Sequence, residues 1–279
     1  MIQRRSFLAS ATAALLLPGG ARAAESRLSL SGAMEQGSLV IGRTAPGAHV
    51  SIDGTPVRVS PDGAFAFGFE YDQKNPTSVE VLFANGTSER RSVTPAVRYY
   101  EIQSINGLPP QIAHPSEPDI TARIQREHAM VAEARKTDSD MIWFAEPLDW
   151  PAAGIISGLF GSQRILNGAP SAPHFGVDIA GGEGGPIHAP ANATVLLAEQ
   201  FFLEGGYTLL DHGHGVFTGY MHQSKQLVKA GDGVLRGQQI GNIGHTGRAT
   251  GPHLHWQMNW NQVRLDPSRS TRTPAPSKA

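Results

Sequence analysis

The chain contains no cysteine and has little charge for its length. Its 279 residues include 0 Cys, and charged residues make up only 17%. Disulfides are therefore excluded, and a metal site must be built from histidine and carboxylate ligands. The hydrophobic fraction is 40%, which is ordinary for a globular protein and excludes a disordered chain.

Hydrophobic runs long enough to span a bilayer are also missing. Residues 1–23 contain the pair Arg4 and Arg5, a short apolar stretch at 8–17 and the small-x-small site Ala21-Arg22-Ala23. This order predicts a cleaved signal peptide, and the paired arginines resemble a twin-arginine export signal. An uncleaved anchor is disfavoured because a span needs about 20 apolar residues. We expect a periplasmic mature protein without a membrane span.

The chain has no excess of basic residues. Lys and Arg number 23 against 24 Asp and Glu, and removal of the three leader arginines leaves 20 against 24, a net charge of −4. This balance does not favour a nucleic-acid partner. What the chain does contain in quantity is Gly (32) and Pro (20), which favours turn-rich β structure.

Residues 24–98 predict an immunoglobulin-like β-sandwich. Short strands are expected at 38–41, 49–52, 64–67 and 79–83. The pairs between them suit turns that need positive φ: Asp53-Gly54, Asp62-Gly63 and Asn85-Gly86. His49 is alone and catalytic residue types are not clustered here. We interpret this region as a spacer or binding module.

Residues 99–149 predict a helical connector. Ser116 precedes Asp119 by three residues, which is typical of a capped helix start, and apolar residues follow near helical spacing. One helix of about five turns is expected, ending near Thr137. His128 has no partner nearby in the sequence and is expected on the helix surface.

Histidines concentrate in the last part of the chain. Eight of the 11 lie between His174 and His255, more than a structural core requires. On a strand, His253 and His255 share one face, and Leu254 and Trp256 share the other. Since Cα atoms two residues apart are about 7 Å apart, one imidazole can bind a metal while the other stands beside it.

Two further segments carry candidate site residues. His174 and Asp178 are four residues apart and would be about 13 Å apart if extended, whereas two ligand atoms on one zinc lie about 3 to 3.5 Å apart. The segment must therefore bend, and Gly176 is the residue best able to allow it. In the alternating strand 216–222, Thr218, Tyr220 and His222 share a face.

The remaining histidines are interpreted differently. His212 and His214 flank a glycine at an expected hairpin tip, where solvent exposure is commoner than metal binding. His188 and His245 lie next to Gly or Pro turns and are expected to line a groove rather than to bind a metal.

Together these motifs resemble the M23 (lysostaphin-type, LytM-domain) zinc peptidases. The motifs are, in order, His174-x-Gly176-x-Asp178, Tyr220-x-His222 and His253-x-His255, and the similarity covers about 150–268. The resemblance implies an antiparallel β-sheet whose groove carries Zn²⁺, in a domain at 150–270 followed by a disordered tail at 271–279. It implies that His174, Asp178 and His255 hold the zinc. It also implies that His222 and His253 do acid-base and transition-state work.

Such a ligand set is typical of a catalytic site. Three protein ligands leave a fourth position for water, whose pKa zinc lowers towards about 7. His253 is the candidate for taking the proton, and His222 would then stabilise the oxyanion or protonate the leaving amine. The sequence leaves open which of the two is the general base. It also leaves open whether Tyr220 orients His222 or is a buried structural residue.

The resemblance implies an exported zinc metalloendopeptidase whose partners are peptidoglycan stem peptides. The expected bond joins D-Ala to diaminopimelate. Relatives that cut glycine bridges often place a tyrosine before the first ligand histidine. Segment 167–173 has none, which disfavours a glycine-bridge substrate. Gln257 stands where many relatives carry an acid. The alternative is a non-hydrolytic LytM-type module that regulates another hydrolase. It is disfavoured because regulatory relatives have usually lost a zinc ligand, and here every position is filled.

Overall fold

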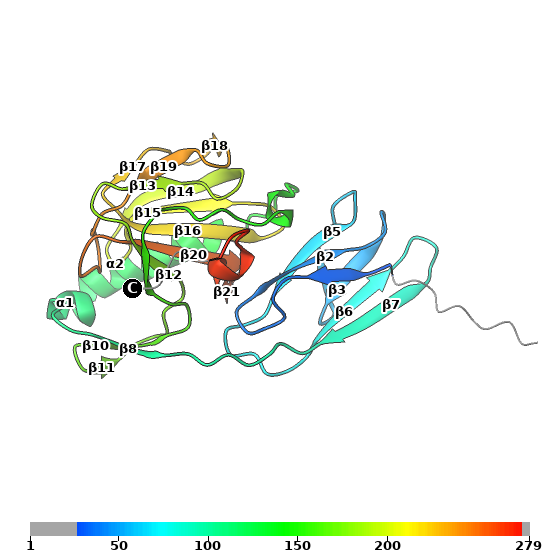
Figure 1. The fold of residues 1–279 in the computed structure, drawn as a ribbon, viewed down its shortest axis with the longest axis horizontal. Helices are drawn as coiled ribbons and strands as arrows, with labels where there is room; N and C mark the ends of the chain where they lie inside the picture. Colours follow the sequence, from blue (N-terminus) through cyan, green and yellow to red (C-terminus); the bar gives the residue numbers. More distant parts are fainter. Residues whose placement is uncertain (1–26, 275–279) are drawn as a thin grey trace, which may run out of the picture.

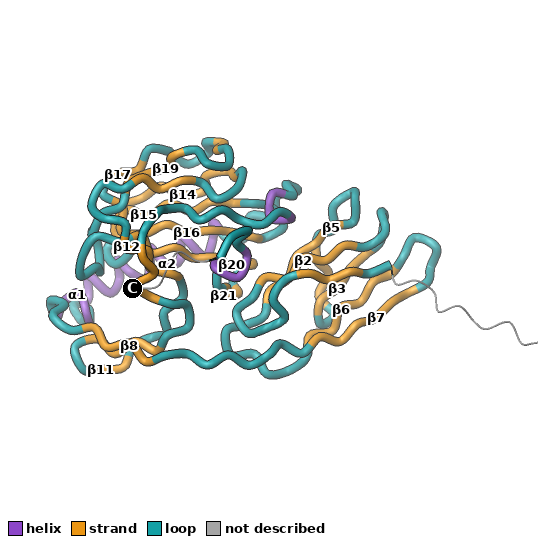
Figure 2. Tube along the Cα trace, viewed as in Figure 1, coloured by secondary structure: helices purple, strands orange, loops and turns teal. Residues whose placement is uncertain are grey.

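The computed structural model describes residues 27–274 and is mainly β, as predicted (Figures 1 and 2). The predicted signal peptide at 1–23 lies outside the described residues. Two β-rich parts lie next to each other, and an extended segment runs from the first part to β8 (Ile102–Ile105) beside the second. Within residues 27–274, no helix is long and apolar enough to cross a membrane.

The N-terminal part is a sandwich of two antiparallel sheets. One sheet has the order β1-β2-β5, formed by β1 (Ser29–Ser31), β2 (Leu39–Arg43) and β5 (Ala64–Gly68). The other has the order β4-β3-β6-β7, formed by β3 (His49–Ile52), β4 (Thr55–Val57), β6 (Thr77–Leu82) and β7 (Ser88–Val93). Alternate side chains fill the space between the sheets, among them Val40, Val50, Phe65, Phe67 and Val81. The four predicted strands are present, and Gly54 and Gly86 have φ of 80° in their turns.

Strand β5 connects the two cores. Phe65 and Phe67 point into the sandwich, whereas Ala64 and Ala66 are buried in the core of the C-terminal part. Small side chains on that face let the second part approach closely. An ion pair of 2.8 Å between Arg98 and Asp266 crosses the same boundary.

The connector differs from its prediction. Its elements are β8, α1 (Pro110–Ala113), α2 (Pro118–Ala134) and η1 (Trp143–Ala145). Helix α2 begins after Glu117, and no side chain caps it, so the predicted Ser116 cap is wrong. Pro118 at the first helical position sets the start through its fixed φ. The helix ends at Ala134, three residues before the predicted end.

The C-terminal part is built on an eight-stranded antiparallel sheet. Its order is β18-β14-β15-β16-β20-β12-β9, and β21 pairs with β20. The strands are β9 (Ile155–Gly158), β12 (Val177–Ala180), β14 (Ala193–Phe201), β15 (Gly205–Asp211), β16 (Val216–Gln223), β18 (Gly233–Val234), β20 (Leu254–Trp260) and β21 (Val263–Leu265).

Two small sheets complete this part. The first sheet contains β13 (Pro186–His188), β19 (Gln239–Asn242) and β17 (Lys225–Gln226). The second contains β11 (Ala169–Pro170), β10 (Gln163–Leu166) and β8, and β8 pairs with β10 in parallel. The connector therefore contributes a strand to the C-terminal part, a long-range pairing that the sequence pattern did not predict.

The end of the described chain is held in place. After η2 (Pro267–Ser270), Thr271 bridges to Leu148, and Arg272 forms an ion pair of 2.7 Å with Asp149. A disordered tail starting at 271 is therefore wrong for these first residues, because backbone and charge contacts fix them. Residues 275–279 lie outside the described part.

Candidate metal centre and active site

Three donor atoms converge at the paired strands β12 and β20. Asp178 and His255 are direct partners in the antiparallel register, so their side chains lie on the same face of the sheet. His174 reaches the same point from the loop before β12. Its Nε2 lies 3.0 Å from Asp178 Oδ1 and 2.8 Å from His255 Nδ1, and the last two atoms are 2.7 Å apart. The predicted bend between His174 and Asp178 is present.

The donor set fits a metal ion. His174 Nδ1 lies 3.0 Å from the carbonyl oxygen of Leu159, which can only accept, so Nδ1 carries a proton and Nε2 is the atom available to a metal. Burial lowers the pKa of His255 to about 4, so the ring of His255 is neutral at neutral pH. Lone pairs directed at one point repel unless a cation lies among them. Two imidazoles and a carboxylate form a common zinc ligand set.

Gly176 is required by space rather than by its backbone angles. A Cβ atom at this position would lie 2.5 Å from Nε2 of His255 and 2.8 Å from the carbonyl oxygen of Trp256. Its φ is not in the left-handed region. The glycine lets the loop that carries His174 pass against the ring of His255, which is how the predicted bend is achieved.

Arg164 holds the second oxygen of the Asp178 carboxylate. Its Nη2 lies 2.5 Å from Asp178 Oδ2, while Oδ1 faces the two histidines. Burial disfavours the charged carboxylate, and the ion pair with Arg164 offsets this cost. Asp178 is therefore a carboxylate with one oxygen directed at the candidate metal position. No local sequence signal marks Arg164 for this contact.

His222 and His253 lie beside these donors with their rings 4.8 Å apart. His222 Nδ1 lies 2.8 Å from the carbonyl oxygen of Thr246, and His253 Nδ1 lies 2.8 Å from that of Gly251. Both Nδ1 atoms must donate, so each neutral ring keeps its lone pair on Nε2. Burial and the nearby His253 and His255 hold the pKa of His222 well below its usual value. Both rings can accept a proton through Nε2.

Tyr220 and His222 form hydrogen bonds with different partners. The tyrosine is fully buried in the core, and its hydroxyl lies 2.8 Å from that of Thr218. The register of β16 shifts against β15 near this point, and His222 adopts a φ of 63°. This break in the strand interrupts the predicted alternation. The Thr246 carbonyl orients His222, and Tyr220 is the buried structural residue of the two alternatives.

Comparison with known proteins identifies the same family that the sequence motifs resemble. Residues 172–267 match the model of peptidase family M23. A crystal structure of a putative peptidase M23 from Pseudomonas aeruginosa is 31% identical in sequence, and the similarity covers 84% of this chain and 93% of that chain with a TM-score of 0.61. The chain belongs to peptidase family M23.

Named relatives match only part of this chain. The peptidoglycan DD-endopeptidase ShyA of Vibrio cholerae is 44% identical over 87 residues, which are 31% of this chain and 20% of ShyA. The peptidoglycan DD-endopeptidase ShyC of the same organism is 37% identical over 123 residues, which are 43% of this chain and 28% of ShyC. The chain thus matches less than a third of the length of these relatives.

The other histidines of the M23 region depart from expectation. His212 and His214 are buried, at 0% and 4% exposure, so the predicted exposed hairpin tip is wrong. His212 contacts the Asn192 carbonyl and Thr218, and the His214 ring packs on Phe144. The connector passes over this turn: a Cβ atom on Gly213 would overlap the carbonyl group of Met141.

His188 and His245 were expected to line a groove. They line neither the pocket that contains His174, His222 and His255 nor the one that contains Asp178 and His253. His245 is exposed and pairs with Glu183 at 2.7 Å. His128 is on the surface of α2 as predicted, and it lies 3.2 Å from Glu204.

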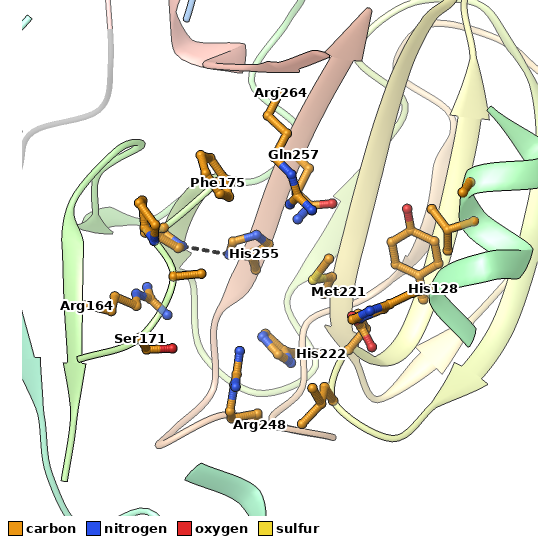
Figure 3. A pocket seen from close by; sticks show the side chains of 18 of the residues that line it. His128, Arg164, Ser171, Phe175, Met221, His222, Arg248, His255, Gln257 and Arg264 are labelled. Atoms are coloured by element: carbon orange, nitrogen blue, oxygen red, sulfur yellow. Dashed lines mark hydrogen bonds and ion pairs between the residues drawn. The ribbon is translucent and has the colours of Figure 1, made fainter. Parts of the chain in front are cut away.

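A pocket of about 460 Å³ opens beside the clustered histidines of the candidate site (Figure 3). His174, His222 and His255 line it on one side, and the end of α2 lines it on the other. The histidine rings are therefore accessible from a cavity large enough for part of a peptide. The connector helix supplies part of the wall of this cavity.

Proposed function

We propose that the protein is an exported zinc metalloendopeptidase that hydrolyses peptide cross-links of peptidoglycan. The observation that carries the proposal is the convergence of His174, Asp178 and His255 next to two further histidines with free Nε2 lone pairs. A structural zinc site would need no such pair. The names of ShyA and ShyC, two peptidoglycan DD-endopeptidases, support peptidoglycan as the substrate. The D-Ala to diaminopimelate bond is the target that the family resemblance implies.

The proposed chemistry assigns a task to each group. His174, Asp178 and His255 would hold zinc, whose charge polarises the scissile carbonyl and makes water more acidic. His253 Nε2 lies 3.8 Å from Asp178 Oδ1 and can take a proton from water at that position. His222, whose ring centre lies 4.8 Å from that of His253, can donate to the oxyanion or to the leaving amine once its own Nε2 has taken up a proton. Arg164 keeps Asp178 charged and oriented.

The proposed place of action is the periplasm. The support is the leader at 1–23, with its paired arginines, which would export a folded and metal-loaded chain. A fusion of this leader to a reporter that is active only after folded export tests the route. Replacement of Arg4 and Arg5 by lysine should retain the reporter in the cytoplasm.

Digestion of purified diaminopimelate-type sacculi tests the activity. The zinc-loaded protein should lower the fraction of cross-linked muropeptide dimers and raise that of monomers, without new reducing sugar ends. His253→Ala is the matched control. If the dimer fraction stays unchanged while a separate amidase becomes more active, the protein is the alternative, a non-hydrolytic LytM-type regulatory module.

A further inference from the structure

The pocket that His174, His222 and His255 line carries an excess of positive charge. Its lining contains four arginines but a single carboxylate, Glu204; the arginines are Arg135, Arg164, Arg248 and Arg264. They come from the end of α2, from β10, from the loop before β20 and from β21. Figure 3 shows Arg164, Arg248 and Arg264 around the cavity. Segments distant in the sequence therefore bring positive charge to one place.

Three of these arginines lack an internal counterion. Arg164 pairs with Asp178, but within residues 27–274 no carboxylate forms an ion pair with Arg135, Arg248 or Arg264. The charge of Glu204 acts on Arg248, but the ion-pair partner of Glu204 is His128, at 3.2 Å. Gln257, which also lines the pocket, is neutral. Glu204 and Glu70 act on Arg264 only from beyond ion-pair distance, so the cavity keeps an excess of positive charge.

Burial makes this arrangement costly without a ligand. Arg135 is 8% exposed, and its Nε has no hydrogen-bond partner. Burial lowers the pKa of Arg248, and burial together with the charge of Arg135 lowers the pKa of Arg264. The Arg264 guanidinium is also fixed over the Phe175 ring, 4.7 Å from its centre. Preorganised, partly desolvated guanidinium groups are typical of carboxylate recognition.

We propose that the guanidinium groups on the wall of this cavity, Arg248 at one end and Arg264 with Arg135 at the other, attract and bind a free carboxylate of the substrate next to the scissile bond. The inference rests on the proposed function and specifies its substrate class. In a D-Ala to diaminopimelate cross-link, the carbon attached to the scissile nitrogen carries a free carboxylate. His222 and His255 line the same cavity as the arginines, so a peptide bond held at these histidines places that carboxylate within the cavity. Cross-links that are amidated at this carboxylate would be poor substrates.

Two synthetic cross-linked peptide dimers test the subsite. They differ only at this group, which is a carboxylate in one and a carboxamide in the other. For the full, zinc-loaded protein, kcat/KM should be about 10- to 100-fold higher for the carboxylate dimer, as expected for a charge-assisted hydrogen bond. Calorimetric titration of the metal-depleted protein should show the same preference in binding, without turnover.

The variants Arg248→Gln and Arg264→Gln should each bring the ratio of the two kcat/KM values towards one, and Arg248→Lys should keep part of it. Arg90→Gln is the matched control, because Arg90 is an exposed sandwich residue that pairs with Glu80, and it should leave the ratio unchanged. Melting curves establish that each variant is folded.

Equal cleavage of both dimers by the wild type would overturn the subsite and leave the peptidase activity intact. An unchanged ratio in Arg248→Gln and Arg264→Gln, with both rates lowered together, would also overturn it, because the arginines would then be structural. If neither dimer nor sacculi are cleaved, the proposed function itself fails.

Discussion

The sandwich and the M23 region bury different kinds of polar residue. In the sandwich the buried polar side chains are neutral, and they are Gln36, Ser38, Thr44, Ser60 and Thr77. The M23 region buries ionisable groups, and these are His174, Asp178, Asp211, His212, His214, His222, His255 and Asp266. Because a buried charge destabilises a fold unless it is paired or binds a ligand, this difference separates a region built for stability from one built for chemistry.

Removal of a candidate metal ligand should have the largest effect. His174→Ala leaves two donors at the site, so metal affinity should fall by more than about 100-fold, and activity should fall with it. Zinc content after dialysis against a moderate chelator measures this loss. A variant that retains one equivalent of zinc would remove His174 from the ligand set.

Removal of a proton-transfer histidine should separate metal content from turnover. His222→Ala and His253→Ala should keep one zinc and lose activity by about 100-fold or more, because a general acid or base is missing. Zinc analysis and muropeptide release are measured on the same preparations. Zinc loss in His253→Ala as large as in His255→Ala would contradict this division of roles.

A core substitution in the sandwich should show the opposite behaviour. Phe65 is fully buried between the two sheets, so Phe65→Ala should lower the free energy of unfolding by about 3 to 5 kcal/mol. Zinc content and turnover per folded molecule should stay those of the wild type. Chemical denaturation measures the free energy of unfolding. An activity assay roughly 20 °C below the melting temperature measures the turnover of the folded protein. Altered turnover in the folded fraction would show that the sandwich acts on the site.

Acidification should destabilise the M23 region through its buried histidines. Burial lowers the pKa of His212 to about 4, below the usual histidine value of about 6.5. Between these values the unfolded chain binds a proton that the folded chain does not, so stability falls as the pH decreases from about 6.5 to about 4, by about 3 kcal/mol. Denaturation of the wild type and of His212→Asn at pH 7.5 and pH 4.5 isolates this contribution. An equal pH dependence in both proteins would exclude His212 as its source.

Local patterns predicted much of the fold, and long-range contacts account for most of the errors. Alternation and Asp-Gly or Asn-Gly pairs located the sandwich strands, because both depend on neighbouring residues. The Ser116 cap was wrong because Pro118 sets the helix start. His212 and His214 were expected in solvent, but residues from the connector and from the loop before β14 cover them.

The candidate site was predicted only where residues form a motif. His174, Asp178, His222, His253 and His255 follow fixed spacings, and the structure brings all five together. The arginines of the pocket come from four separate segments, and no spacing links them in the sequence. Their role depends on burial and on missing counterions, which only the folded chain reveals.

The central claim is that three of the five clustered residues bind zinc and the other two do not. X-ray absorption of the zinc-loaded protein measures this most directly. The account predicts two imidazole ligands together with oxygen ligands, a spectrum unchanged in His222→Ala and His253→Ala, and one imidazole in His255→Ala. Three or more imidazoles in the wild type, with one lost in His222→Ala or His253→Ala, would contradict it.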